Sequence, residues 1–304
     1  MSARSTVIVP TLADSSRADS LRRALDSLWT STTDPASLRI HVVVNGQRHD
    51  PAVLEWLKAQ PVTLTQLQLG SAPLARLEGR RLVETDYFGY LDDDDEYLPG
   101  SLDERVLALE SDRDSDLLVC NGWELRQSRD QLLFHQLTQL RVDPLRALLR
   151  ENWLASGGSL FRTATVGVTY FEDPMPYFEW TWLAWRLAID GRRIRVSETP
   201  GFRIHDTPGS ASKSSEYAAA NIELFERMLA DEPPSDVARI VSGRLQAQWA
   251  QRSASRLASG DVASARAAWR NVQRYPGAWR YTGLILRHTA SQLVSKFTSA
   301  FGMH

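Results

Sequence analysis

Hydrophobic positions in the first 120 residues fall into two alternating patterns. Short, continuous apolar runs predict strands at residues 5–9, at 40–44, around Leu64, Leu67 and Leu69, and at 87–91. Apolar residues three and four apart predict helices between these strands, at residues 17–30, 51–59 and 71–83. This alternation predicts an α/β fold, in which a mostly parallel sheet carries helices on both faces.

The rest of the chain mixes short strands with longer helices. Pro99 is expected to open a helix in its first turn, where the missing N–H of proline does no harm. The later pattern predicts antiparallel strands within 117–138, helices at 143–150 and 179–189, and short strands at 193–197 and 202–205. Further helices are expected at 236–259, 261–275 and 279–297. We therefore expect a larger domain over residues 1–215 and a helical extension over 216–304.

Composition agrees with a soluble globular protein, because 43% of the residues are hydrophobic and 24% are charged. Cys120 is the single cysteine, so an internal disulfide is excluded; its place in an apolar run predicts a buried thiol. No run reaches the roughly 18 apolar residues that a membrane span needs, and no secretory signal is visible. We expect a cytoplasmic protein, with peripheral attachment to a membrane left open.

Charge is distributed unevenly along the chain. Residues 235–304 carry ten Lys and Arg against two Asp, a net charge of +8, which leaves −10 for the remainder. The last predicted helix, 279–297, combines basic and apolar positions. These basic helices could dock on an anionic membrane or a lipid-linked acceptor, or pack on the larger domain or on a second subunit as a homo-oligomer. No nucleic acid partner is expected.

Four adjacent aspartates, Asp92–Asp95, follow the strand at 87–91 directly. Adjacent carboxylates are unfavourable in a cleft unless a cation compensates their charge. In an extended chain Asp92 and Asp94 point to the same side. Hard carboxylate oxygens suit Mg²⁺ or Mn²⁺, which could hold a diphosphate. The alternative is an acidic turn that only precedes the next helix.

Four segments together carry a more specific signal. They are Val7–Thr11 (VIVPT), Val42–Gly46 (VVVNG), Ala75–Arg76 with Gly79, and Tyr90–Gly100 (YLDDDDEYLPG). In this order and at this spacing the chain resembles a family-2 glycosyltransferase of the GT-A fold, over about residues 5–210. The resemblance implies a nucleotide-binding half at 1–100 and a catalytic, acceptor-binding half at 101–215.

The resemblance also implies roles for single residues. Nucleotide binding falls to Pro10, Thr11, Asn45, Arg76, Asp92 and Asp93, and the Mn²⁺ or Mg²⁺ site to Asp94 and His205. Asn45 stands where the family often has aspartate, which leaves the identity of the base open. Gly157 and Gly158 resemble the loop beneath the donor sugar, where glycine permits a close approach. Trp153 and Trp180 could stack on a sugar ring, whereas Trp182 and Trp185 are expected in the core.

The catalytic base is the point at which the chain departs from the family. Inverting transfer needs a carboxylate that removes the proton of the acceptor hydroxyl. When the chain is aligned through Arg186, Glu179 takes the first position of the family's acidic pair and Trp180 replaces the aspartate. We expect Glu179 to be the base, with Glu172 and Asp173 in reserve.

The expected activity is inverting transfer of a sugar from a nucleotide-diphospho-sugar, with UDP, dTDP or GDP as the nucleotide, to a hydroxyl of a glycan or a lipid-linked acceptor. One alternative is a sugar-1-phosphate nucleotidyltransferase, but the Gly-rich basic loop that it would need is not found at Pro10–Asp14. Another is a catalytically impaired scaffold that binds a glycan or a nucleotide, which the tryptophan at position 180 motivates.

Overall fold

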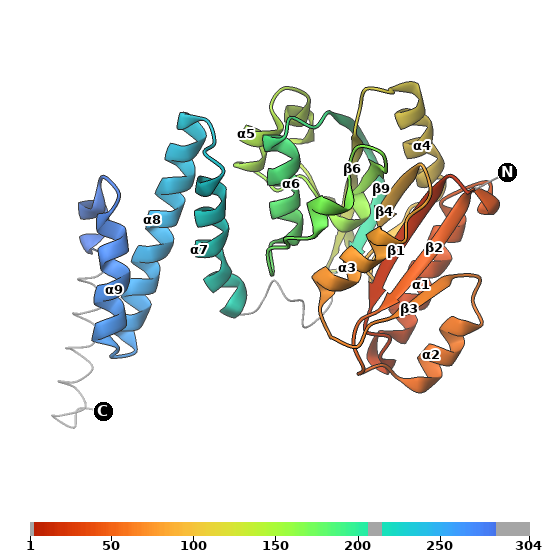
Figure 1. Cartoon of the computed structure of the whole chain (residues 1–304), viewed down its shortest axis with the longest axis horizontal. Coiled ribbons are helices and arrows are strands. Elements are labelled where there is room, and N and C mark those ends of the chain that lie inside the picture. The colour runs from red at the N-terminus through yellow and green to blue at the C-terminus, as the bar shows by residue number, and fades with distance from the viewer. Residues whose placement is uncertain (1–2, 206–214, 284–304) are drawn as a thin grey trace. The chain divides into compact units, whose positions relative to one another are not determined.

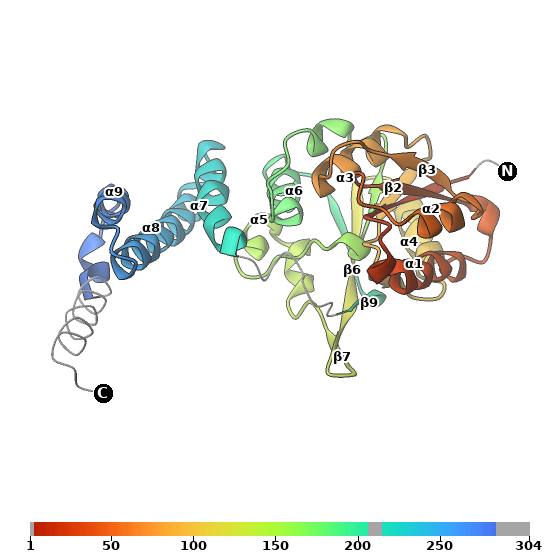
Figure 2. The same cartoon turned by 90° about the horizontal axis from the view of Figure 1, so that it is seen from below.

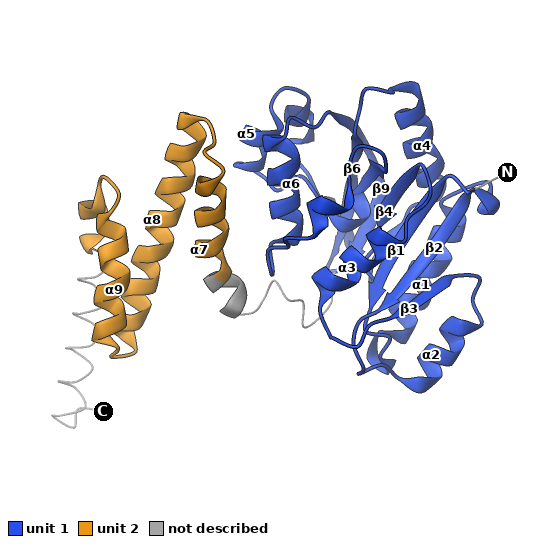
Figure 3. Ribbon diagram, in the orientation of Figure 1, with its two compact units in different colours: residues 1–211 blue, residues 212–304 orange. Residues whose placement is uncertain are grey.

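The structure is a computed structural model that describes residues 3–205 and 215–283. The chain forms two compact units, one up to residue 211 and one from residue 212 (Figure 3). The first unit contains a sheet and its covering helices, and the second unit is helical.

The first unit is built on a single curved sheet (Figure 1). One half consists of four parallel strands in the order β3-β2-β1-β4, with bounds Thr63–Gln66, Leu38–Val44, Ser5–Thr11 and Tyr87–Tyr90. The other half continues as β8-β6-β9-β5, with bounds Ser159–Arg162, Leu117–Arg126, Ile194–His205 and Glu96–Tyr97. β8 runs antiparallel to β4 and β6, and β7 (Arg129–Leu132) pairs with β6. The first half is the parallel βα pattern that the sequence predicts.

Helices connect the parallel strands and cover both faces. They are α1 (Ala18–Thr30), α2 (Pro51–Lys58) and α3 (Ala72–Arg81). Because parallel crossovers are right-handed, α1 and α2 lie on one face, and α3, which leads back to β4, lies on the other (Figure 2). Asp50 caps α2, since its Oδ1 accepts a hydrogen bond from the N–H of Ala52 at 2.7 Å.

The remaining helices of this unit are α4 (Ser101–Ser111), α5 (Pro144–Leu148) and α6 (Glu179–Ile189). Trp182 and Trp185 on α6 are buried, as predicted, and so is the thiol of Cys120. The core is densest under β1 and β4, where every residue of both strands is buried. These two strands lead directly to the polar groups discussed below.

Three sequence predictions about the elements are wrong. Pro99 does not open α4: the helix begins at Ser101, and Gly100 turns the chain into it with a left-handed φ of +72°. β3 ends at Gln66, and Leu69 is 71% exposed in the loop that follows. The predicted strands at 193–197 and 202–205 form one continuous strand, β9. Pro200 is tolerated within it because the pairing with β6 shifts register beside it.

The second unit consists of α7 (Ser215–Ala230), α8 (Ser235–Ala258), α9 (Val262–Gln273) and a short 3₁₀ turn, Ala278–Tyr281. Buried polar groups join α8 to α9: the amide of Gln246 donates to the carbonyl of Val272 at 3.0 Å, and the hydroxyl of Ser253 donates to that of Ala265 at 2.9 Å. The predicted helix at 279–297 lies largely outside the described residues. Within 3–205 and 215–283, none of the helices has the length and apolar character to cross a bilayer.

Candidate functional site

Asp92–Asp95 lie at the carboxyl edge of the parallel strands. β4 ends at Tyr90, and its neighbour β1 ends at Thr11, whose hydroxyl donates to Asp93 Oδ2 at 2.6 Å. The N–H of Asn45, just beyond β2, donates to the carbonyl of Thr11 at 2.7 Å. Three adjacent strand ends therefore meet at the aspartates, at the edge where α/β sheets bind ligands.

The first three aspartates contact cations from three different helices. Asp92 lies 3.1 Å from Nη2 of Arg76 on α3. Arg17, in a 3₁₀ turn just before α1, contacts both Asp93 at 2.9 Å and Asp94 at 2.6 Å through Nη2. Arg23 on α1 donates to the carbonyl oxygen of Asp94 at 2.7 Å. The hydroxyl of Ser156 also donates to Asp92, at 3.2 Å.

The end of the run is connected to β9. Oδ1 of Asp95 accepts a hydrogen bond from the N–H of His205 at 3.1 Å. Glu96, the next residue, contacts Arg203 Nη1 at 2.8 Å and His205 Nε2 at 3.0 Å. His205 thus lies beside the acidic run, as the sequence predicts for a residue of the site, but its Nε2 faces Glu96. Its role as a metal ligand stays a prediction.

Burial and crowding change the acidity of these carboxyls. Burial, with the charges of Asp94 and Asp92, raises the pKa of Asp93 to about 6 against the lowering effects of Arg17 and Thr11. Burial and the charges of Asp92 and Asp94 raise the pKa of Asp95 to about 9. Burial is the largest cause of both increases in pKa.

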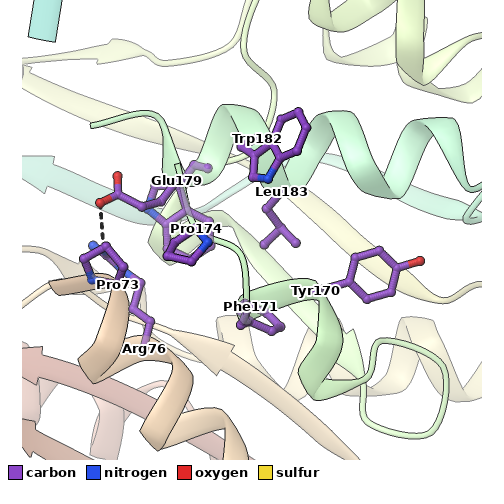
Figure 4. A pocket seen from close by; sticks show the side chains of 9 residues that line it. Pro73, Arg76, Tyr170, Phe171, Pro174, Glu179, Trp182 and Leu183 are labelled. Atoms are coloured by element: carbon purple, nitrogen blue, oxygen red, sulfur yellow. Dashed lines mark ion pairs between the residues drawn. The ribbon is translucent and has the colours of Figure 1, made fainter. Parts of the chain in front are cut away.

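Arg76 connects the aspartates to the predicted base. Its Nη1 lies 4.0 Å from Glu179 Oε1 (Figure 4). Its Nη2 contacts Asp92. The Arg76 guanidinium also lies over the Trp180 ring, 5.3 Å from the centroid. Burial alone would lower the pKa of Arg76, but the charges of Asp92 and Glu179 outweigh it and raise the pKa. The arginine is thus held as a permanent cation between two carboxylates.

A pocket opens beside this arginine, between α3 and α6 (Figure 4). Its volume is about 360 Å³, which includes space open to solvent. Most of its lining is apolar, and Arg76 and Glu179 supply the charged groups: the lining residues are Pro73, Arg76, Tyr170, Phe171, Pro174, Glu179, Trp180, Trp182 and Leu183. Trp180 therefore lines a cavity beside Glu179, and its predicted stacking on a sugar stays a prediction.

Two predicted nucleotide contacts are already engaged within the protein. The side-chain oxygen of Asn45 accepts a hydrogen bond from the N–H of Ser71, the N-cap of α3. Pro10 is buried in β1 opposite Val43. In the structure, Asn45 fixes the start of the helix that carries Arg76. The nucleotide-binding roles of Asn45 and Pro10 stay predictions.

Gly157 and Gly158 have a packing role that the sequence reading missed. A Cβ on Gly157 would lie 2.8 Å from the Phe202 ring, and one on Gly158 would lie 2.9 Å from it. Gly122, on β6, is even closer to the same ring, at 2.4 Å. The missing side chains make room for Phe202, so they do not by themselves indicate space for a sugar.

Trp153 does not belong to the site surface. It is 1% exposed, and its indole N–H donates to the carbonyl of Pro144 at 3.0 Å. Both observations place the ring in the core beside α5. The prediction that Trp153 stacks on a sugar disagrees with this burial, since a platform needs an accessible ring face.

The donor set of the aspartate run fits a hard divalent cation. Its oxygens are carboxylates, which are the ligands that Mg²⁺ and Mn²⁺ prefer. Among the described residues no group of three or more His, Cys, Asp or Glu is arranged to hold a metal. Arg17 takes the position of a cation between Asp93 and Asp94 instead.

Arg17 and Ser156 are contacts that the sequence reading did not assign. Arg17 follows the first strand by six positions, at the start of a predicted helix, so its nearness to that strand's carboxyl end could have been inferred. Ser156 lies in the same turn as Gly157 and Gly158. It is the hydroxyl of this turn, and not the glycines, that contacts Asp92.

Solved structures with the same fold are found at low sequence identity. S. aureus TarS 1-349 in complex with UDP-GlcNAc is 13% identical, with a TM-score of 0.66 over 94% of this chain and 89% of that chain. The mannosyltransferase PcManGT from Pyrobaculum calidifontis, in complex with GDP-Man and Mn²⁺, is 17% identical, with a TM-score of 0.52 over 100% of this chain and 84% of that chain. These likenesses confirm the expected GT-A fold with C-terminal helices. No curated protein matches the sequence.

Sequence similarity to a family covers the part of the chain that carries the acidic run, but not Glu179 or His205. The model described as glycosyl transferase family 2 matches residues 6–154, which include β1 to β7 and the four aspartates. This agrees with the geometry, in which three strand ends gather around an acidic run. Residues 6–154 thus match glycosyl transferase family 2, the family that the sequence resembles.

Proposed function

We propose that the protein is an inverting, metal-dependent glycosyltransferase that uses a nucleotide-diphospho-sugar as donor and a hydroxyl of a glycan or a lipid-linked molecule as acceptor. The observation that carries the proposal is the position of Arg76, which contacts Asp92 and Glu179 at 3.1 and 4.0 Å. The acidic run and the candidate base therefore belong to one site, although 86 positions separate Asp93 from Glu179 in the sequence.

Each residue type suits a part of this reaction. Asp94, with Asp92, would hold Mn²⁺ or Mg²⁺, and a bound ion of this kind neutralises charge that develops on a diphosphate leaving group. Arg76 would bind the same diphosphate, since guanidinium groups recognise phosphate oxygens. Glu179 would accept the proton of the acceptor hydroxyl, which then attacks the anomeric carbon on the side opposite the leaving group.

The neighbouring folds guide the choice of donors to test. TarS was solved with UDP-GlcNAc and PcManGT with GDP-Man, so UDP- and GDP-sugars come first. A true donor should raise the melting temperature of the protein in the presence of Mn²⁺, because it binds the folded state. Release of the nucleoside diphosphate, with and without acceptor, then measures turnover. Absence of any stabilisation or turnover across UDP-, dTDP- and GDP-sugars would contradict the proposal.

A second candidate is a protein that binds the donor without transferring the sugar. Trp180 favours it, because this residue stands at the family's aspartate position and covers Arg76 with its ring. Such a protein would show the thermal shift with a nucleotide sugar but no release of nucleoside diphosphate in the presence of any acceptor. Turnover that disappears in Glu179→Gln excludes it. A nucleotidyltransferase would instead form a nucleotide sugar from a nucleoside triphosphate.

The helical unit could bring the enzyme to an anionic membrane that carries its acceptor. Between residues 235 and 283 it has eight arginines and two aspartates, and Trp279 is 73% exposed beside Arg280. Flotation with vesicles of anionic lipid tests this attachment: we expect binding that salt weakens. Failure to bind at low salt would leave packing on a second copy of the chain, which the oligomeric state in solution would reveal.

A further inference from the structure

Arg17 is the cation closest to the pair of carboxylates at the centre of the run. Its Nη2 lies 2.9 Å from Asp93 Oδ1 and 2.6 Å from Asp94 Oδ2. Asp93 is 5% exposed, whereas the Arg17 side chain is 30% exposed. One guanidinium nitrogen therefore satisfies two carboxylates that would otherwise repel each other.

The geometry of the Arg17 contacts allows another cation to replace the guanidinium. Both shortest contacts use Nη2, while Nε is buried and makes no hydrogen bond within the described residues. The guanidinium therefore does not bind a single carboxylate in a bidentate arrangement, which is the strongest geometry for such a pair. Asp93 keeps a second partner, because the Thr11 hydroxyl donates to its other oxygen at 2.6 Å.

We propose that Arg17 is a displaceable counter-cation that competes with the divalent metal ion for Asp94. This inference rests on the proposed function, in which Asp94 is a metal ligand. A divalent ion bound to Asp94 would lie within a few ångströms of the Arg17 guanidinium, and two cations at that separation repel strongly. Metal binding therefore requires the Arg17 side chain to leave, and this requirement weakens the affinity for the metal alone.

The contact with Arg17 also reduces the repulsion between the two carboxylates. Asp93 and Asp94 lie on the turn between β4 and β5, and Asp93 is 5% exposed. Two further contacts hold the turn independently of Arg17: the Thr11 hydroxyl donates to Asp93, and the N–H of Asp95 donates to the carbonyl of Asp92 at 3.1 Å. Loss of the Arg17 charge should therefore leave the turn closed.

The test is a titration of the protein with Mn²⁺ in the absence of nucleotide. Binding is measured as the loss of the electron paramagnetic resonance signal of free Mn²⁺. Arg17→Gln should bind Mn²⁺ roughly tenfold more tightly than the wild type, or better, because the competing charge is gone. Arg17→Lys keeps the charge and should stay close to the wild type. A merely structural role for Arg17 predicts the opposite, namely weaker binding in Arg17→Gln as the loop opens.

Arg22→Gln is the matched control, because it removes the same charge from the neighbouring helix. Arg22 pairs with the exposed Asp19 at 3.0 Å and lies over Trp56, away from the aspartate run. If Arg17→Gln binds Mn²⁺ no more tightly than Arg22→Gln, or if Arg17→Lys gains as much as Arg17→Gln, the proposal is overturned. The variants should fold, since Asp14 caps the turn through the backbone N–H of residue 17; circular dichroism checks this.

Failure of this inference can be told apart from failure of the proposed function. Binding of UDP, dTDP or GDP by the wild type in the presence of Mn²⁺ is measured separately, by calorimetry. A wild type that binds none of these nucleotides contradicts the proposed function. A wild type that binds one of them, combined with unchanged Mn²⁺ affinity in Arg17→Gln, contradicts only the role given to Arg17.

Discussion

Nη1 of Arg76 lies 4.0 Å from Oε1 of Glu179, and this ion pair joins the third helix of the nucleotide-binding half to the first turn of α6. Both side chains are largely covered, with 14% and 22% exposed. An ion pair that is partly shielded from water responds more strongly to mutation than an exposed one. The pair is therefore a sensitive point for testing the site.

We expect Arg76→Met to lower kcat/KM for the donor by about 10–100-fold, because a charged hydrogen-bonding group near the diphosphate is lost. Arg76→Lys should recover part of this loss. Arg39→Met is the control, since Arg39 is 51% exposed and pairs with the exposed Glu84. Equal effects of the two methionine variants on kcat/KM would argue against a role for Arg76 in donor binding.

Glu179→Gln should lower kcat by about 10²–10⁴-fold, the usual contribution of a general base. Donor affinity should change little, because the amide keeps the size of the side chain. Glu172→Gln and Asp173→Asn, in the preceding loop, serve as comparisons. If one of these abolishes turnover while Glu179→Gln remains active, the base has been assigned to the wrong carboxylate.

Asp94→Asn should remove most of the Mn²⁺-dependent turnover, a loss of at least about 10²-fold, because an amide binds a divalent cation much more weakly than a carboxylate does. Asp114→Asn changes an aspartate that is 82% exposed and pairs with Arg193, and it should have no effect. Turnover that stays metal-dependent in Asp94→Asn would contradict the metal site.

Gly158→Ala should destabilise the first unit by about 1–3 kcal/mol, the usual effect of overpacking. Its new methyl group would lie 2.9 Å from the Phe202 ring. In a double-mutant cycle, Phe202→Ala and Gly158→Ala together should cost less than the sum of both. Gly70→Ala is the control, because a Cβ there meets nothing within 4 Å. Additive effects on the melting temperature would show that the ring and the glycine do not compete for space.

Much of the fold could be predicted from the sequence, because its signals are local. The buried runs of β1, β2 and β4 and the helices between them follow directly from hydrophobic spacing. The break before α4 was misplaced by two residues, since proline and glycine both signal a turn and only the backbone shows that Gly100 carries the left-handed conformation. The sequence predicts two strands in place of the single strand β9, because Pro200 interrupts the hydrophobic pattern.

The site was predicted as a set of residues, but not as a set of contacts. The sequence places Thr11 and the aspartates at neighbouring strand ends, and the structure joins them. It does not show that Arg17 turns back to Asp93 and Asp94, because the direction of a long side chain depends on tertiary packing. The same holds for Trp153: an aromatic residue next to a glycine-rich loop has no sequence signal that separates a sugar platform from a core residue.

Phe202 has a further consequence for the position of His205, three residues later on the same strand. Successive residues of a strand face opposite sides, so a slip of β9 by one position would bring Gly201 or Arg203 to the space among Gly122, Gly157 and Gly158. A glycine would leave that space empty, and an arginine would bury a charge in it. The Phe202 ring therefore fixes the register of β9 to a single residue. It thereby also fixes the position of His205 against the acidic turn.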